Sequence, residues 1–337
     1  ARETTESDTG GPAWLGSTEA LRSEASPPPR APDPLLPTLQ RRAILATALG
    51  VDVADGGLDL DRVVHTLSHG LPLCGLPRRP RRTLRYGVEV WLDRAPWLEP
   101  FHADQQALVT YLRTLFPSDR VVLRRCKGSP QEIRPRRRGS SAPGGERPDS
   151  RAAALLLTDF GAGYRPLGVP PPAAADWRRQ ARQFARQQRV AVALLPLPPT
   201  ARVATAIREL ASLPWNERTT VRDAARLRSG APADRSPELP LDDQALLALA
   251  RVLSPAVRID PWLLRAARRR FLPRYGAELE AALWFGPLVA SRGADGIVLE
   301  SALLPELRAG LSEQGPAVIG AAVALVEAEH AQYPVAL

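Results

Sequence analysis

Predicted strands alternate with amphipathic stretches in the middle of the chain. The strands cover residues 86–93, 120–126, 152–159 and 190–197, and several of them are continuous apolar runs. Between them, residues 104–116 and 177–188 place apolar side chains three and four positions apart, which is typical of helices packed on one face. Uninterrupted apolar runs are typical of parallel strands covered on both faces. The pattern therefore predicts an α/β domain over residues 84–215, with a doubly wound, mostly parallel sheet.

After residue 215 only helical spacing is visible. Candidate helices cover residues 220–228, 242–253, 261–271, 275–285, 300–311 and 317–331. We therefore expect an α-helical domain over residues 216–331. A further helix is expected over residues 203–213, where it would complete the α/β unit.

The chain before residue 84 has a different character. Residues 1–34 are rich in Ser, Thr, Gly and Pro, which predicts a disordered lead or linker. Residues 35–83 are expected to form a helical extension, with helices over 35–50 and 58–70, followed by a basic linker. Within the α/β domain, residues 127–150 show no period and predict a long basic loop.

The composition is that of a basic globular protein. The 337 residues are 44% hydrophobic and carry a formal net charge of +9. Lys127 is the sole lysine, and a GC-rich genome would explain this arginine bias. The alternative explanation is an anionic partner, because guanidinium groups bind phosphate bidentately. The candidate contacts are Arg78, Arg79, Arg81, Arg82, Arg136, Arg137 and Arg138.

Several classes of function are disfavoured by the motifs. No apolar run approaches the roughly 18 residues that span a bilayer, so we expect a cytoplasmic protein that does not bind membranes. Cys74 and Cys126 lack CxxC spacing, and His65 and His69 lack the glutamate of an HExxH zinc motif. The sequence also has no GxSxG and no P-loop motif. We expect no cofactor and no catalytic residues.

Two acids follow predicted strands directly. Asp93 ends the run 86–93, and Asp159 ends the run 152–159. Ligands of doubly wound sheets bind at the carboxyl ends of the strands, and two carboxylates there could hold Mg²⁺. The alternative is that each acid caps the turn or helix that follows it.

The residues around these acids resemble the metal-ion-dependent adhesion site of von Willebrand A domains. Residues 93–97 (DRAPW) lie where that family carries Asp-x-Ser-x-Ser, and Thr158-Asp159 is similar to its Thr-Asp-Gly motif. Ala95 and Trp97 replace the two serines. The resemblance therefore implies a degenerate metal site that holds no metal.

Residues 80–93, 104–109, 155–161, 192–199 and 215–220 (WNERTT) are similar to a degenerate bacterial subgroup of these domains. Members of the subgroup resemble modules of bacterial conflict and antiviral defence systems. They are fused to formylglycine-generating-enzyme-like or other effector domains.

The resemblance to this subgroup implies a protein partner such as a MoxR-type ATPase or an effector domain. We accordingly expect a non-enzymatic interaction module that presents the loops after Asp93 and Asp159. The alternatives are an arginine-rich nucleic-acid-binding sensor and a Mg²⁺-dependent enzyme using the two acids.

Overall fold

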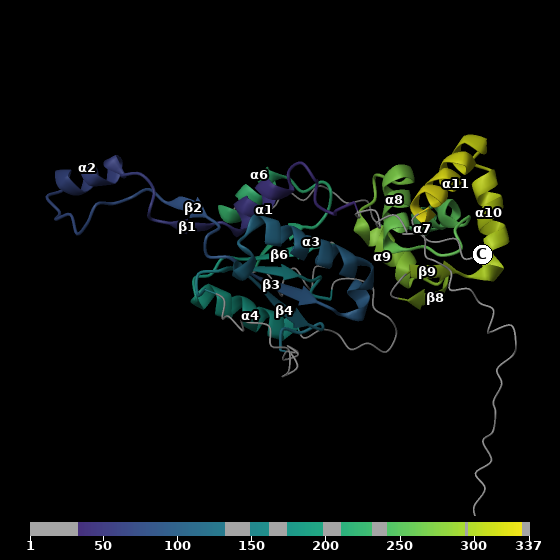
Figure 1. The fold of residues 1–337 in the computed structure, drawn as a ribbon, viewed down its shortest axis with the longest axis horizontal. Helices are drawn as coiled ribbons and strands as arrows, with labels where there is room; N and C mark the ends of the chain where they lie inside the picture. The colour runs from purple at the N-terminus through teal and green to yellow at the C-terminus, as the bar shows by residue number, and fades with distance from the viewer. Residues whose placement is uncertain are drawn as a thin grey trace, which may run out of the picture.

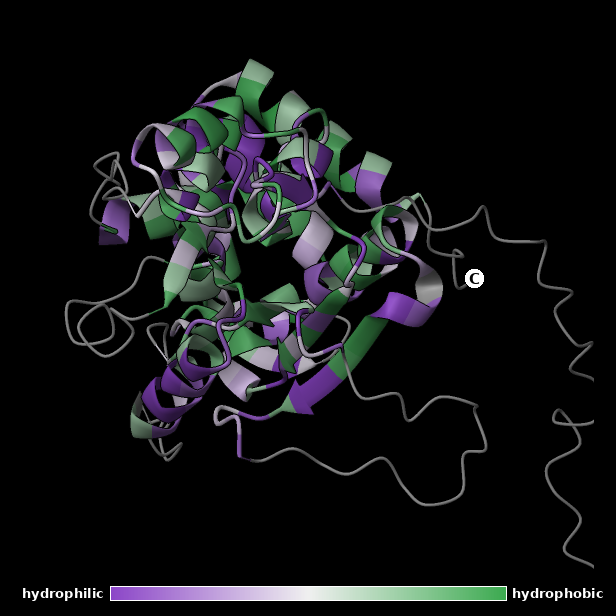
Figure 2. Cartoon of the chain, turned by 90° about the vertical axis from the view of Figure 1, so that its left-hand side faces the viewer, coloured by the Kyte–Doolittle hydropathy of each residue, from purple (hydrophilic) through white to green (hydrophobic). Residues whose placement is uncertain are grey.

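The computed structural model describes residues 33–131, 149–161, 174–197, 210–230, 241–293 and 296–331. The chain forms three parts arranged in a row (Figure 1). An arm, defined here as residues 51–83, extends from one end of a central α/β domain. A helical domain lies at the other end. Hydrophobic and hydrophilic residues alternate along the helices of both domains (Figure 2).

The central sheet has five parallel strands in the order β4-β3-β5-β6-β7. They are β3 (Val88–Asp93), β4 (Val121–Cys126), β5 (Ala153–Leu157), β6 (Ala191–Leu195) and β7 (Ala211–Pro214). The order of connection reverses between β3 and β5, which are neighbours in the sheet. Such a reversal is the topological switch point, where doubly wound proteins bind their ligands.

Helices cover both faces of this sheet. On one face lie α1 (Arg41–Leu49), α3 (His102–Leu115) and α6 (Val221–Arg228), and on the other lies α4 (Ala174–Arg186). Alternate strand residues explain the two layers: Leu155 packs with the first group of helices, and Leu156 packs with α4. All residues of β5 are buried, as expected of a central strand. The prediction of a parallel, doubly wound α/β sheet is confirmed.

The edge strand β7 corrects one expectation. The predicted helix over residues 203–213 ends in a segment that forms β7, since Ala211 pairs with Val192 of β6 in parallel register. Residues 198–209 lie outside the described part of the chain. A short apolar segment at a sheet edge has no period that separates a strand from a helix turn.

The helical domain has its own hydrophobic core. Its helices are α7 (Asp243–Leu253), α8 (Pro261–Phe271), α9 (Ala277–Phe285), α10 (Leu304–Ser312) and α11 (Pro316–His330). A hairpin of β8 (Val289–Gly293) and β9 (Gly296–Leu299) joins α9 to the next helical segment. The spacing of apolar residues predicted only helices in this domain and did not predict this hairpin. Short 3-10 helices lie at η2 (Pro96–Phe101), η3 (Ser118–Arg120) and η4 (Ser301–Leu303). No helix of the described residues is long and apolar enough to cross a membrane.

The arm begins and ends in a two-stranded antiparallel ribbon. Strands β1 (Val51–Val53) and β2 (Arg81–Thr83) form it, and helix α2 (Leu60–Ser68) lies at its far end (Figure 1). The prediction for residues 35–83 gave both helices but not the ribbon. No residue between 51 and 83 is buried, so the arm contributes nothing to the core of either domain.

Candidate functional site

The two acids predicted as a site lie side by side at the switch point. Asp93 is the last residue of β3, and Asp159 follows the carboxyl end of β5, the strand beside it. Both side chains are buried, at 0% and 1% exposure. The hydroxyl of Thr158 donates to Oδ2 of Asp93 at 2.7 Å, so the ends of the two strands are joined through this acid.

Asp93 accepts hydrogen bonds at both carboxylate oxygens. Its Oδ1 receives the backbone N–H of Ala95 at 3.0 Å and that of Gly128 at 2.8 Å. Gly128 follows β4, so this one carboxylate binds residues from three adjacent strand ends. Carboxylates that accept backbone N–H groups in this way organise turns, which accounts for the burial of Asp93 without a counter-ion.

Asp159 accepts hydrogen bonds from the indole of Trp97 and from the turn that follows β5. The indole Nε1–H of Trp97 donates to Oδ1 of Asp159 at 2.9 Å, and the backbone N–H of Gly161 donates to the same oxygen at 2.8 Å. Trp97 lies on η2 and is 4% exposed. The indole therefore lies beside the two acids, where the resemblance would place a hydroxyl.

Aromatic side chains close the site from the side of α4. Phe160 has a φ of +54°, a conformation rarely adopted by bulky residues. Its ring packs edge-on against Trp177, with ring centroids 5.2 Å apart. The indole of Trp177 donates to the carbonyl of Gly128 at 2.9 Å. The strained turn at Phe160 thus directs a large ring into the space beside the acids.

The environment of Asp93 disfavours its charged form. Burial raises the pKa of Asp93 to about 6, and the nearby charge of Asp159 also raises it. The hydrogen bonds from Gly128, Thr158 and Ala95 act in the opposite direction and only partly offset burial. The carboxyl of Asp93 therefore takes up a proton at a pH well above that of an exposed aspartate.

These residues do not fit a hard divalent cation. Mg²⁺ takes six oxygen ligands in a near-octahedral arrangement, whereas Ala95 and Trp97 offer no side-chain oxygen. The indole N–H is a donor and cannot bind a cation. Within the described ranges no group of three or more His, Cys, Asp or Glu side chains is placed to hold a metal.

The helical domain covers this edge of the sheet. Ala277 and Ala281 of α9 belong to the same hydrophobic cluster as Trp97, Leu98 and Phe101 of η2. The indole of Trp284, also on α9, lies 3.4 Å from a carboxylate oxygen of Glu99. The segment η2, which follows Asp93, therefore packs against the chain's own helical domain.

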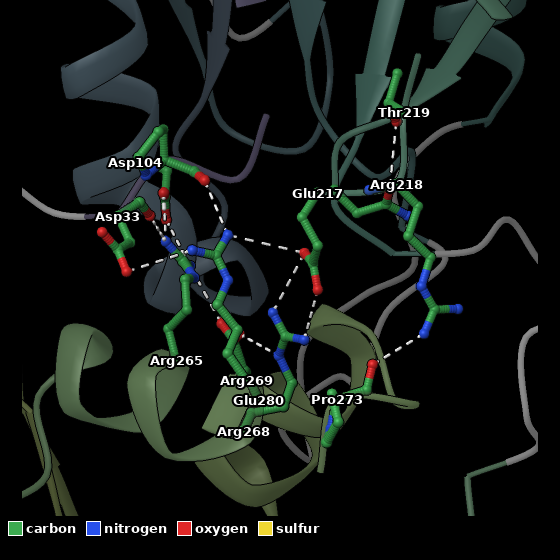
Figure 3. Close-up of polar contacts among 12 residues, drawn as sticks. Asp33, Asp104, Glu217, Arg218, Thr219, Arg265, Arg268, Arg269, Pro273 and Glu280 are labelled. Atoms are coloured by element: carbon green, nitrogen blue, oxygen red, sulfur yellow. Dashed lines mark hydrogen bonds and ion pairs between the residues drawn. The ribbon is translucent and has the colours of Figure 1, made fainter. Parts of the chain in front are cut away.

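Buried arginines of α8 hold the two domains together (Figure 3). Arg265 binds Asp104 of α3 with two parallel hydrogen bonds of 2.6 and 2.8 Å. Arg265 and Arg268 also bind Glu280 of α9, at 3.1 and 2.7 Å. Arg268 reaches Glu217, in the segment after β7, at 2.9 Å. We call these five residues the interdomain clamp.

The WNERTT segment, residues 215–220, contributes to this clamp.

 Glu217 binds Arg268, and the guanidinium of Arg218 donates to the carbonyls of Pro273 and Arg274, each at 3.0 Å. Thr219 returns a hydrogen bond to the carbonyl of Pro214 at 2.6 Å, which fixes the turn after β7 (Figure 3). Residues 215–220 thus dock the α/β domain onto the helical domain.

The clamp carries charges in the protein interior. Arg265 and Arg268 are 1% and 0% exposed, and Glu280 is 1% exposed. Burial alone would lower the pKa of Arg265, but the carboxylates of Asp104 and Glu280 outweigh burial and raise it. The group is therefore held charged, and removing one partner would leave an unpaired charge in a dry interface.

Ion pairs engage three of the four arginines in the described residues that were expected to contact an anion. Arg81 pairs with Asp55 and Arg82 pairs with Asp52 across the ribbon, while Arg79 pairs with Asp61. Arg78 donates to the carbonyl of Gly56. Arg136, Arg137 and Arg138 lie outside the described residues. The basic run at 78–82 is thus largely neutralised within the arm.

The fold and this edge define a doubly wound α/β protein whose switch point is filled by its own side chains. Comparison with protein-family models, with curated proteins and with solved structures gives no match for the chain. The resemblance to von Willebrand A domains stays a sequence-based prediction.

Replacing Asp93 by asparagine removes the buried charge and should stabilise the protein at neutral pH. Because the pKa of Asp93 is raised from 3.8 to about 6, the folded state binds this proton more tightly than the unfolded state. The resulting stability is present below pH 4 and is lost as the pH rises through 6. Near pH 8 the free energy of unfolding of Asp93→Asn should exceed that of the wild type by on the order of 1–3 kcal/mol.

Urea denaturation between pH 4 and 8 measures this difference, which should shrink toward pH 4. The same substitution at the exposed Asp119 is the control and should show no such trend. A difference between Asp93→Asn and the wild type that is the same at every pH would contradict a buried ionisable Asp93.

Truncating a clamp arginine should loosen the helical domain. Arg265→Ala leaves Asp104 buried without its partner and removes one of the two arginines that bind Glu280, which costs about 3–5 kcal/mol. Arg270→Ala, on the exposed face of the same helix, should cost less than about 0.5 kcal/mol. Thermal denaturation and limited proteolysis between the domains test both variants, and equal losses in the two would show that the clamp does not hold the interface.

Proposed function

We propose that this chain is a non-catalytic protein-interaction module built on a von Willebrand A-like domain with a degenerate metal site. The observation that carries the proposal is the Trp97–Asp159 hydrogen bond, together with the three donors on Asp93. These contacts use the acids to hold the loops of the sheet edge. A Mg²⁺-dependent enzyme would need the same oxygens free to bind the ion.

The rigid junction of the two domains supports the same proposal. The interdomain clamp and the shared apolar contacts of η2 and α9 make the α/β domain and the helical domain one body. A body of two joined domains can present a fixed surface to another protein. By the resemblance noted above, the proposed partners are a MoxR-type ATPase or an effector domain of a bacterial defence system.

Affinity purification of the tagged chain from its native host tests the proposal. A protein partner should be recovered in stoichiometric amount, and nuclease treatment should not remove it. Recovery should also persist in EDTA and in Asp93→Asn, since the proposed binding does not use a cation. Recovery of the chain alone would contradict the proposal, and loss of the partner in EDTA would indicate metal-dependent binding instead.

Nucleic-acid binding is a second candidate function, and the surface of α4 favours it. Its arginines lie on the solvent side of the helix. They are Arg178, Arg179, Arg182 and Arg186, and together with Ala175 and Gln183 they line an open surface depression. Three of them are spaced four residues apart, so one helix face could follow a phosphate backbone.

Substitution of the α4 arginines tests this second candidate. If α4 binds nucleic acid, the triple variant Arg178→Gln, Arg182→Gln and Arg186→Gln should lower the slope of log K against log salt by about 2–3. A control that removes three other exposed arginines, Arg78, Arg79 and Arg270, should leave the slope nearly unchanged. Fluorescence anisotropy with labelled DNA and RNA provides the measurement, and no binding at low salt would eliminate this candidate.

A further inference from the structure

The arm concentrates the exposed apolar surface of the protein. Eleven large hydrophobic residues are exposed among those the structure describes, and seven of them lie between residues 58 and 76. They are Leu58, Leu60, Val64, Leu67, Leu71, Leu73 and Leu76, with exposures from 36% to 64%. Contiguous apolar surface on a soluble protein marks an interaction site. The arm extends away from both domains (Figure 1), so neither domain covers this surface.

Local sequence explains why the arm still forms a helix. The side chain of Asp59 accepts from the backbone N–H of Arg62 at 3.2 Å and caps the first turn of α2. Gly70, with a φ of +67°, ends it. Within the helix, Leu60, Val64 and Leu67 lie on one face, at positions i, i+4 and i+7. Helix α2 has no buried residue, so this face lacks the partner that amphipathic helices normally have.

The charges of the arm do not favour a strongly anionic partner for its apolar surface. Over residues 51–83, four aspartates (52, 55, 59 and 61) face five arginines (62, 78, 79, 81 and 82), so the net formal charge is +1. The whole chain carries +9. An anionic lipid surface or a nucleic acid would be attracted by a large excess of positive charge, which the arm lacks. A second copy of the chain meets little net repulsion at this point.

We propose that two copies of this chain associate through α2, packed antiparallel about a twofold axis. The apolar positions 60, 63, 64 and 67 are symmetric about the midpoint between Val63 and Val64. Antiparallel pairing therefore places Leu60 of one copy against Leu67 of the other, and Val63 against Val64, as a self-complementary twofold interface requires. It also sets the two helix dipoles in opposite directions. This inference concerns a surface separate from the sheet edge, so it does not depend on the proposed function.

Sedimentation equilibrium of the full chain over a concentration series tests the association. The wild type should form a dimer, and the double variant Val64→Asp/Leu67→Asp should raise the dimer dissociation constant at least tenfold. Both side chains are exposed, so the variant should keep the circular dichroism spectrum and melting temperature of the wild type. Val257→Asp, at an 85% exposed position of the helical domain, is the matched control and should still dimerise.

Disulfide formation tests the antiparallel arrangement in a Cys74→Ser background, which removes the exposed thiol. A mixture of Leu60→Cys and Leu67→Cys chains should form a cross-linked dimer under mild oxidation. Leu60→Cys alone should not, because seven residues of helix separate the two thiols by roughly 10 Å. A monomeric wild type, a dimer unaffected by Val64→Asp/Leu67→Asp, cross-linking of Leu60→Cys alone, or arm-dependent binding to phosphatidylglycerol vesicles without dimerisation would each overturn the proposal.

Discussion

Burial of a carboxylate at the end of β3 is the constraint on which the centre of this protein depends. An unpaired buried charge is costly, so each oxygen of Asp93 needs a donor. The donors come from the next turn, from the end of β4 and from the end of β5. Satisfying one side chain therefore fixes the relative position of three strand ends. The same requirement at Asp159 fixes η2, because Trp97 supplies the donor.

Fixing η2 has consequences beyond the sheet. Its apolar residues form the surface on which α9 packs, and Asp104 in the first turn of the following helix receives Arg265 of the helical domain. The polar network at the switch point and the interdomain clamp are thus connected through η2 and α3, which follow each other directly in the chain. Apolar contacts provide the area of this junction, while the bidentate arginine pair restricts its geometry. The result is a crevice closed by hydrogen bonds within one domain and covered by the other domain.

The hydrophobic pattern was sufficient to predict the layers and most elements. Apolar runs such as the one ending in Asp93 are typical of central strands in a parallel sheet. Because neighbouring parallel strands end at the same edge, Asp93 and Asp159 then lie close together. The clamp could not be predicted, because Asp104, Glu217 and Arg265 lie on amphipathic or irregular segments that resemble solvated surface. In the arm, the spacing of Leu60, Val64 and Leu67 is that of an amphipathic helix, and the structure leaves its apolar face open. Sequence spacing identifies an apolar face but contains no information on what covers it.

The indole of Trp97 also constrains how this site could change in evolution. Placing Ser at position 95 alone would leave the indole in place and supply one hydroxyl beside carboxylates that are already satisfied. Replacing Trp97 alone would remove a buried aromatic ring and leave a cavity, a change that typically costs about 3–5 kcal/mol, together with the donor to Asp159. Each single substitution toward an ion-binding form is thus either without benefit or destabilising. The hydrogen bonds that hold this edge of the sheet therefore also resist its conversion into an ion-binding site.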